Sequence, residues 1–433
     1  MKQELTQGVR KLLPAGAVRL LEEGYRRARV QAVSARYGYP ARGLRVIAIT
    51  GTNGKTTTAN YLNEILKAAG KTTAMFTTAV IEVAGKWRIN DLNATVATTE
   101  QMQQFFREAK LAHVDYVVLE ITSHALHQHK LDTVPIECAI MTNLTQDHLD
   151  YHKTMEAYAA AKGKLFAGRP QFIILNRDDV WFDYFDQFEA GEQKMTYGSH
   201  ADAECKITKV KLYKKGSEAT LLVDHQTTLE LGTALPGKFN VYNMTAAAAA
   251  AYVLHTPLDA IADGVANLEA VPGRFERIES DKPFEVIVDY AHTPDALEQL
   301  LEAAKALTKN RVILVFGACG DRDKTKRPIM GGIAARQADR IFVTDEESYS
   351  EDPAEIRRMV LDGIQEARGG GKTEEIADRR EAIAKALSIA RAGDTVLVTG
   401  MGHEQYRIIA GERVPWNDSD VVRELLTGSA EKN

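Results

Sequence analysis

Short apolar runs alternate with stretches of helical periodicity from residue 45 onward. The runs are rich in β-branched residues, and several end in polar or glycine-containing loops, as buried parallel strands do. They are "VIAI" (46–49), "YVVLE" (116–120), "CAIMT" (138–142), "FIILN" (172–176), "VIVDY" (286–290), "VILVF" (312–316), "RIFVT" (340–344) and "TVLVT" (395–399). Between them, "NYLNEILKAAG" places Leu62, Ile65 and Leu66 on one helical face and ends at Gly70, a suitable cap. The pattern predicts an α/β fold built on mostly parallel sheets.

Two stretches depart from this alternation. Residues 202 to 232 alternate more regularly, which predicts antiparallel strands with a turn at Lys215-Gly216 in a small sheet of their own. "LEAVPGRFERIE" breaks the pattern at Pro272-Gly273 and suggests a domain boundary. We therefore predict a basic helical segment (1–44), a central phosphate-loop domain with a mostly parallel sheet (45–272) and a C-terminal Rossmann-like α/β domain (273–433).

The N-terminal segment differs in charge from the rest of the chain. Residues 1 to 45 carry ten Lys and Arg residues against three Glu, a balance of +7 in a chain whose net charge is -5. Val18, Leu21 and Tyr25 lie at helical spacing, which predicts a basic, weakly amphipathic helix. We expect this helix to pack on the first domain. Weak contact with an anionic membrane surface, or with a phosphate-bearing ligand, is the alternative.

Composition narrows the function classes. The chain has 433 residues, of which 45% are hydrophobic, enough for more than one core. A pI near 6.2 gives no reason to expect nucleic acid as a partner. The cysteines, Cys138, Cys205 and Cys319, are widely spaced and match no metal motif, which fits a reducing cytoplasm. With no apolar run long enough for a signal peptide or a spanning helix, we expect a soluble, cytoplasmic protein.

A strand leads directly into the loop Gly51-Thr52-Asn53-Gly54-Lys55-Thr56-Thr57 and then into a helix. In such a loop the backbone N–H groups surround a phosphate, Lys55 reaches the β- and γ-phosphates, and Thr56 can ligate Mg²⁺. The usual eight-residue pattern requires glycine at position 49, where this chain has Ile49, so the loop is a variant. The order of strand, loop and helix predicts binding of ATP or GTP.

Polar residues follow two further strands at the edge where open α/β sheets bind ligands. Glu120 follows one strand, and Asn143, Asp147 and His148 follow another. Glu and His beside a triphosphate are reasonable Mg²⁺ ligands, directly or through water.

Nine motifs together resemble the Mur ligases. They are "GTNGKTT", "LEITSHAL", "TNLTQDHLDYH", "YAAAKGKLF", "PGRFE", "VDYAHTPDAL", "FGACGDRDKTKRP", "SEDP" and "GMGHEQY", in the family's order over residues 45 to about 420. They are most similar to the group that adds the third amino acid to UDP-N-acetylmuramoyl-L-alanyl-D-glutamate, the UDP-N-acetylmuramoyl-tripeptide synthetases. The resemblance implies a monomeric, ATP-dependent amide ligase of peptidoglycan precursor synthesis. A carboxylate becomes an acyl phosphate, an amino acid attacks it, and ADP and phosphate leave.

The resemblance also implies roles for single residues. Lys55, Glu120, His148 and Lys162 would be catalytic. Thr56 and Glu120 would hold a first Mg²⁺, and His148 with Lys162 a second, Lys162 being carbamylated in the family. The nucleotide would contact the phosphate loop (Gly51, Thr52, Asn53, Gly54, Lys55, Thr56 and Thr57) together with Asn143, Arg274 and Asp289. The muramoyl peptide would contact Thr98, Thr99, Ser123 and Lys130, and Lys130 replaces the family's usual Arg, with loss of bidentate geometry.

Only about 50 residues precede the phosphate loop, too few for the UDP-binding domain with which muramoyl ligases usually begin. Folylpolyglutamate synthetases, or a polyglutamate-type ligase on an acceptor without UDP, are therefore alternatives, although the former carry different patterns at the loop and at "DYAHTPDAL". A third alternative is that the protein is a catalytically silent scaffold with the same fold. Intact Lys55, Glu120, His148 and Lys162 argue against it.

The added amino acid is suggested by one further departure. Where ligases that use meso-diaminopimelate read Asp-Asn-Pro-Arg, this chain reads Glu346-Glu347-Ser348-Tyr349. The stretch has no guanidinium for a distal carboxylate and has two acidic side chains that would repel one. With Glu347, Tyr349 and Glu404 as amino-acid-binding residues, we expect L-lysine or a similar diamino acid. The alternative is that the two acids only favour the positive end of a helix starting near Pro353.

Overall fold

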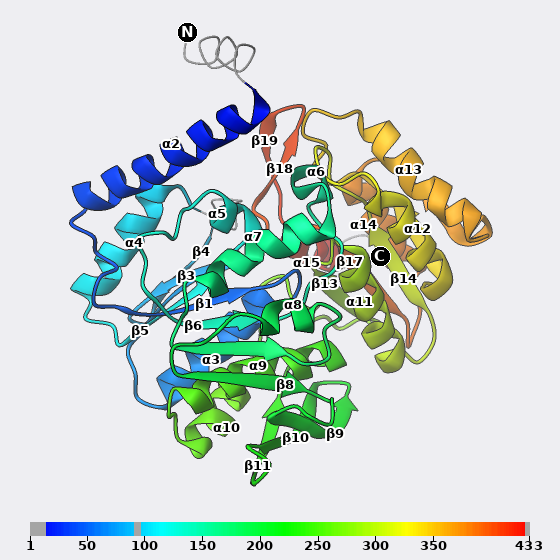
Figure 1. The fold of residues 1–433 in the computed structure, drawn as a ribbon. Coiled ribbons are helices and arrows are strands. Elements are labelled where there is room, and N and C mark those ends of the chain that lie inside the picture. The colour runs from blue at the N-terminus through cyan, green and yellow to red at the C-terminus, as the bar shows by residue number, and fades with distance from the viewer. Residues whose placement is uncertain (1–13, 91–96, 429–433) are drawn as a thin grey trace.

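The computed structural model describes residues 14–90 and 97–428, which form two large sheets with helices on both faces (Figure 1). Parts of the basic N-terminal segment, including Lys2, Arg10 and Lys11, lie outside the described residues. All eight strands predicted from the apolar runs are confirmed. No helix in the described ranges has the length and apolar character needed to cross a bilayer.

The central sheet has eleven strands in the order β11-β10-β9-β8-β7-β6-β1-β5-β2-β3-β4, and the strands from β9 to β2 pair in parallel. They are β1 (Arg45–Thr50), β2 (Thr73–Phe76), β3 (Val80–Val83), β4 (Lys86–Ile89), β5 (Tyr116–Glu120), β6 (Ile136–Met141), β7 (Phe172–Asn176), β8 (Gln193–Gly198), β9 (Cys205–Tyr213), β10 (Gly216–Val223) and β11 (Thr227–Thr233). Buried β1 and β6 lie near its centre, which explains their almost continuous apolar sequences.

Alternate side chains of β1 enter different cores. Ile47 and Ile49 pack against α3 (Lys55–Ala68), α9 (Lys238–Val253) and α10 (Leu258–Asn267) on one face. Val46 and Ala48 belong to the core on the other face, which is covered by α4 (Thr99–Leu111), α5 (Ser123–His127), α7 (Met155–Ala167) and α8 (Phe182–Asp186). The short α6 (Leu149–His152) precedes α7. Burial on both faces holds β1, and hence the loop that follows it, in a fixed position.

One topological prediction is wrong. The antiparallel strands β9, β10 and β11 form as expected, with the turn between Tyr213 and Gly216, but they are not a separate sheet. Tyr197 and Gly198 of β8 pair in parallel with β9, so the three strands extend the central sheet. Local alternation reveals antiparallel pairing within the segment but contains no information about the strand on its outer edge.

The second sheet has six strands in the order β12-β13-β17-β14-β15-β16, all parallel except β12. They are β12 (Glu276–Ile278), β13 (Glu285–Asp289), β14 (Val312–Phe316), β15 (Arg340–Val343), β16 (Thr373–Glu375) and β17 (Thr395–Thr399). Helices α11 (Pro294–Leu307), α12 (Lys326–Gln337) and α13 (Pro353–Glu366) cover one face, and α14 (Arg379–Ile389) and α15 (Asp418–Gly428) the other. A 3-10 turn (Gly370–Lys372) precedes β16. Strands β18 (Tyr406–Ile409) and β19 (Glu412–Pro415) form a separate antiparallel hairpin.

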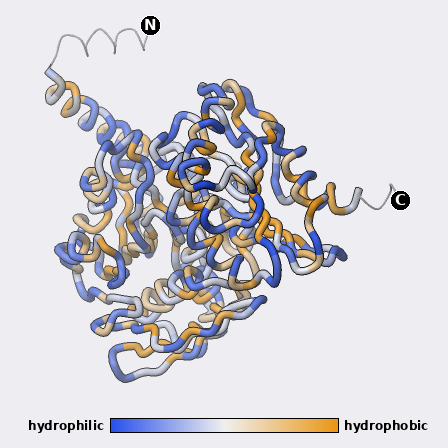
Figure 2. The backbone as a smooth tube through the Cα atoms, turned by 90° about the vertical axis from the view of Figure 1, so that its right-hand side faces the viewer, coloured by the Kyte–Doolittle hydropathy of each residue, from blue (hydrophilic) through white to orange (hydrophobic). Residues whose placement is uncertain are grey.

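The N-terminal helix α2 (Ala15–Arg36) packs against α4 (Figure 1), as predicted for the basic segment. Among the side chains of α2 that the structure describes, Val30 and Ser34 are buried, whereas Leu21 and Tyr25 of the predicted apolar face are exposed. Hydrophilic and hydrophobic stretches mix along this helix (Figure 2). The packing face is therefore narrower and lies closer to the C-terminal end of α2 than the sequence pattern suggested.

Candidate active site

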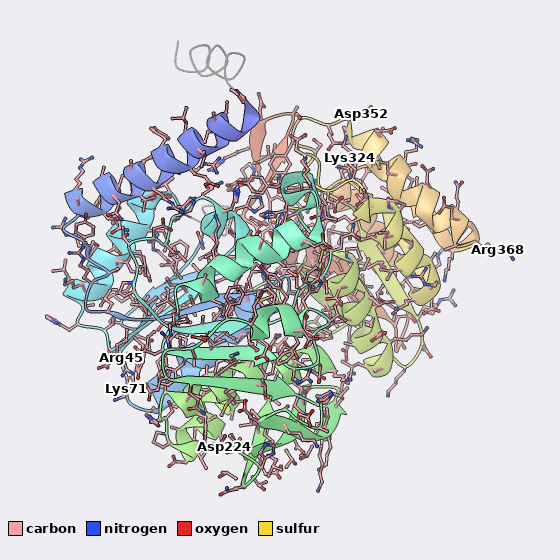
Figure 3. All side chains as sticks on the ribbon, in the orientation of Figure 1. Arg45, Lys71, Asp224, Lys324, Asp352 and Arg368 are labelled. Atoms are coloured by element: carbon pink, nitrogen blue, oxygen red, sulfur yellow. The ribbon has the colours of Figure 1, made fainter. Side chains whose placement is uncertain are left out.

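A cavity of about 1090 Å³ is lined by residues that follow strands of both sheets. Its lining includes the phosphate loop, the segments after β5 and β6, and the C-terminal residues Arg274, Asp289, Lys326 and Glu404. Strand β1 begins at Arg45, labelled in Figure 3, and ends at Thr50 directly before the loop. The site thus lies at the carboxyl edge of the central sheet, where the sequence predicted it.

Two glycines of the phosphate loop permit close approach of other backbone and side-chain atoms. Gly51 has φ +149, and a Cβ there would lie 1.8 Å from the Thr142 hydroxyl oxygen. Gly54 has φ +83, and a Cβ there would lie 2.2 Å from Oδ1 of Asn243. Both distances are far below van der Waals contact. A side chain at either position would therefore displace the phosphate loop, which leads directly into helix α3.

Lys55, Thr56 and Glu120 meet as predicted. The Thr56 hydroxyl donates to Glu120 Oε2 at 2.8 Å, and Lys55 Nζ lies 3.9 Å from Glu120 Oε1. Lys55 Nζ also donates to the Thr52 carbonyl at 2.7 Å, so its ammonium lies within the loop. Burial, the main cause, lowers the pKa of Lys55. A hydroxyl and a carboxylate beside a phosphate loop are the donors that Mg²⁺ takes together with phosphate oxygens, so these residues fit that ion.

The predicted nucleotide residues converge from both sheets. Asn143 Oδ1 accepts from the backbone N–H of Asn53 at 2.9 Å, and Arg274 Nη2 donates to the Thr56 hydroxyl at 3.2 Å. Asp289 is buried at the end of β13, where it accepts from the N–H of Phe275 at 2.6 Å. Burial raises the pKa of Asp289. Asn143, Arg274 and Asp289 all line the cavity.

Lys162 differs from an ordinary surface lysine of a helix. Only 1% of it is exposed, and Nζ donates to the Gly51 carbonyl at 2.7 Å. Burial, reinforced by the charge of Lys55, holds the pKa of Lys162 well below its usual range, so a neutral amine is favoured. This amine lies behind the loop, and Lys162 does not belong to the described lining of the cavity.

His148 lines the cavity at the start of α6, with Nε2 3.3 Å from Asp147 Oδ2. Burial lowers the pKa of His148 to about 3, which leaves the neutral imidazole that a metal ion requires. In the described part of the chain no three His, Cys, Asp or Glu side chains form a ready metal cluster. A second ion would therefore need further donors, such as phosphate oxygens or a carbamate on Lys162.

The structure adds an ion pair that sequence analysis missed. Lys326, in "FGACGDRDKTKRP", donates from Nζ to Asp147 Oδ1 at 3.1 Å, and both side chains are buried. Burial opposes ionisation of Asp147, but the Lys326 ammonium beside it holds the carboxyl pKa far below its usual range. His292 Nε2 lies 3.9 Å from the same carboxylate. The pair joins the two sheets across the cavity.

The predicted contacts for the acceptor are only partly gathered at the cavity. Lys130 lines it, and its Nζ donates to the Ala97 carbonyl at 3.1 Å. Thr98 instead caps α4, because its hydroxyl accepts from the N–H of Gln101 at 3.2 Å. Ser123 is buried, with its hydroxyl 2.9 Å from His152 Nε2. Thr98, Thr99 and Ser123 are absent from the described lining of the cavity.

Two carboxylates and an arginine from the C-terminal part of the chain also line the cavity. Glu347 accepts from the Tyr349 hydroxyl at 2.9 Å, and Glu404 accepts from the Tyr290 hydroxyl at 3.1 Å. Burial and then the charge of Glu347 raise the pKa of Glu404 to about 8. Arg322 Nη2 donates to the Tyr349 hydroxyl at 3.1 Å, so a guanidinium is present although the 346–349 stretch has none.

Glu346 has a structural role. Its Oε1 accepts from the N–H of Gly317 at 3.1 Å. Helix α13 is capped by Asp352, labelled beside Lys324 in Figure 3, and has Glu355 in its first turn. Glu346 and Glu347 thus lie outside that turn, which argues against the interpretation that they only favour the start of this helix.

Comparison with known proteins identifies the family. Residues 49–251 match the Mur ligase middle domain, and residues 273–402 match the Mur ligase glutamate ligase domain. The chain is 40% identical over 408 residues to the UDP-N-acetylmuramoyl-L-alanyl-D-glutamate–2,6-diaminopimelate ligase of Geobacillus kaustophilus strain HTA426, covering 92% of this chain and 82% of that protein. The chain belongs to the Mur ligase family.

Further Mur ligases support this assignment, and a more distant enzyme shares the fold. The ligase of the same name from Bacillus velezensis is 39% identical, covering 89% of this chain and 79% of that protein. A solved structure of such a ligase has a TM-score of 0.61 at 34% identity, covering 90% of this chain and 79% of that one. A Mycobacterium tuberculosis folylpolyglutamate synthase with ADP shares the fold, with a TM-score of 0.72 at 20% identity over 86% of this chain and 91% of that one.

Family membership confirms the predicted enzyme class and fold class. As a Mur ligase, the protein is an ATP-dependent, ADP-forming ligase of an acid and an amino acid, and it belongs to peptidoglycan precursor synthesis. Its parallel central sheet and C-terminal α/β unit are those of the Mur ligase fold. The silent scaffold and the folylpolyglutamate alternative are correspondingly disfavoured.

Proposed function

We propose that this Mur ligase adds a diamino acid to the D-glutamyl carboxylate of a muramoyl-L-alanyl-D-glutamate acceptor. One observation carries the proposal: the phosphate loop, Lys130 and the pocket of Glu347 and Glu404 line one continuous cavity. A triphosphate, an acceptor carboxylate and an amine can therefore meet there. The names of the curated relatives describe the same acceptor.

The charges in the cavity suit acyl phosphate formation. The γ-phosphate and the acceptor carboxylate are both anions, so their reaction needs concentrated positive charge. Lys55 supplies one charge from the loop, and Arg274 and Lys326 approach from the C-terminal sheet. Mg²⁺, when bound at Thr56 and Glu120, would add further charge stabilisation. The amine then attacks the acyl carbon, and phosphate is the leaving group.

Lys162 is the proposed site of carbamylation. A buried neutral amine is the form that reacts with carbon dioxide, and burial of Lys162 favours that form. The resulting carbamate anion, with His148, would hold a second Mg²⁺ and compensate the charge of Lys55. The proposal therefore includes two ions.

The proposed amino acid is L-lysine, in preference to meso-diaminopimelate. In this proposal Arg322 binds the α-carboxylate, and the carboxylates of Glu347 and Glu404 favour an ammonium group at the other end. The relatives are named for diaminopimelate, whose distal carboxylate would need a second cation. If Arg322 instead binds a distal carboxylate, diaminopimelate is preferred, and the ratio of kcat/KM for the two amino acids separates these cases.

Several further properties belong to the same proposal. We propose a cytoplasmic monomer divided at residues 44 and 272 into the three predicted parts. A weak membrane contact through α2 would use the exposed Leu20, Leu21 and Tyr25 on the apolar side and the basic charge of the N-terminal segment against anionic headgroups. Binding to anionic vesicles, compared with a Leu20→Ser, Leu21→Ser variant, tests that contact.

Phosphate release tests the proposed reaction. ATP, Mg²⁺ and UDP-N-acetylmuramoyl-L-alanyl-D-glutamate are mixed with L-lysine, meso-diaminopimelate or L-glutamate, and the amide product is identified by mass. Release that requires both acceptor and diamino acid supports the proposal. Turnover only with a glutamylated acceptor without UDP would support the polyglutamate alternative, and no release with any amine would support the scaffold.

A further inference from the structure

Helix α2 places two arginines beside the acceptor end of the cavity. Arg29 Nη2 lies 3.3 Å from Glu100 Oε1 in the first turn of α4. Arg27 Nε lies 3.4 Å from His129 Nδ1 and 3.8 Å from Asp132 Oδ2. The side chain of Arg29 is 54% exposed and that of Arg27 is 62% exposed. Each guanidinium therefore has a protein partner and is still accessible to a ligand.

Lys130 connects these arginines to the cavity. It follows His129 in the chain, lines the cavity and donates from Nζ to the Ala97 carbonyl. The Ala97 carbonyl lies three residues before Glu100, the ion-pair partner of Arg29, so Lys130 and Arg29 approach the same end of α4. Burial lowers the pKa of Lys130, and the charge of Arg29 lowers it further. We call the three cations Arg27, Arg29 and Lys130 the basic rim.

The basic rim combines two arginines in exposed ion pairs with a lysine bound to a carbonyl. Arg29 lies 3.3 Å from Glu100 and Arg27 3.8 Å from Asp132, whereas Lys130 donates to the Ala97 carbonyl. Exposed pairs of this kind contribute little to stability and exchange readily for a stronger anion. A group of like charges that includes the cavity-lining Lys130 therefore favours an anionic ligand rather than a purely structural role.

We propose that the basic rim binds the diphosphate through which the muramoyl peptide is joined to its nucleotide carrier. The inference rests on the proposed function, because it needs an acceptor whose carboxylate lies at the phosphate loop. The peptide then extends toward Lys130, and the carrier leaves the cavity past α2. Arginine is suited to this position because its planar guanidinium forms paired hydrogen bonds to phosphate oxygens.

The test compares acceptors with and without the diphosphate. An Arg27→Gln, Arg29→Gln variant is assayed with UDP-N-acetylmuramoyl dipeptide and with N-acetylmuramoyl dipeptide, and binding of both is measured by calorimetry. We expect the KM and Kd for the UDP-linked acceptor to rise about tenfold or more, the scale of a lost charge-assisted contact, with less than a twofold change for the other. Arg358→Gln is the matched control, because Arg358 is also exposed and ion-paired, on α13.

A second variant distinguishes ligand binding from structural support. Glu100→Gln removes a competitor for Arg29 and should tighten binding of the UDP-linked acceptor, whereas a structural pair would only be weakened. Equal losses with both acceptors in the double variant, or no loss with either, would overturn the inference. If wild-type protein turns over neither acceptor, the proposed function fails, and calorimetry with the UDP-linked acceptor still decides the role of the rim.

Discussion

The use of lysine should depend on pH through Glu404. Glu404 is 7% exposed, and burial together with the charge of Glu347 raises the pKa of its carboxyl to about 8. An acid with a raised pKa is mostly neutral below that value and ionised above it. The ionic pairing of Glu404 with a substrate ammonium is therefore weak at low pH and is gained as the pH rises through about 8.

The expected size follows from that pKa. The ionised fraction of Glu404 is about 9% at pH 7 and about 91% at pH 9, a tenfold difference. The ammonium of the lysine side chain, with a pKa of about 10.4, stays charged over this range. L-norleucine has the same α-amine without the ammonium, so dividing kcat/KM for lysine by that for norleucine cancels the ionisation of the attacking amine. This ratio should rise about tenfold from pH 7 to pH 9.

The assay is phosphate release at saturating ATP and acceptor. The concentration of each amino acid is varied, and kcat/KM is determined at several pH values between 6.5 and 9. In Glu404→Gln the ratio should be small and independent of pH. In Glu347→Gln the rise should move to lower pH, because one cause of the raised pKa is removed. A wild-type ratio that does not change with pH, or a rise that persists in Glu404→Gln, would refute the reasoning.

Three further predictions concern catalysis and stability. Lys55→Ala should lower ATP turnover by about 10³ or more, because the loop charge on the transferred phosphate is lost, and unchanged steady-state turnover would contradict the phosphate-loop assignment. Lys162→Ala should lose most activity without rescue by bicarbonate, since no amine remains to be carbamylated; wild-type kinetics would exclude that role. Arg379→Met should lower the free energy of unfolding in urea by about 3–5 kcal/mol, because it leaves the fully buried Asp418 without its cation and with only the Trp416 indole as a side-chain donor. Arg380→Met, at an exposed ion pair, is the control and should cost less than about 1 kcal/mol, so equal effects would contradict the burial argument.

The predictable parts of the molecule are those encoded by neighbouring residues. Buried strands are continuous apolar runs, and the phosphate loop, Lys55 and Thr56 lie within one short segment. Glu120 could be placed at the same site because parallel strands end at a common edge. The roles of Thr98, Thr99 and Ser123 as acceptor contacts remain predictions, since these residues are seen only in a helix cap or in buried positions.

Residues that meet through the fold were harder to foresee. Lys326 and Asp147 are 179 positions apart, and no periodicity connects them. Arg322 reaches Tyr349 from a different loop, so the absence of arginine in the 346–349 stretch did not mean the absence of a guanidinium in the pocket. The sequence contains one local indication that Lys162 is buried. The small residues Ala159, Ala161 and Gly163 beside it are typical of a helix packed closely against its neighbours.

The ion pair between Lys326 and Asp147 makes the charge of the site depend on both sheets. Lys326 begins α12, which covers the C-terminal sheet, and Asp147 lies at the edge of the central sheet that carries the phosphate loop. A nucleotide in the loop is therefore surrounded by positive charge from two separate parts of the chain. A substitution that loosened the contact between them would remove the Lys326 charge from the site without altering the phosphate loop.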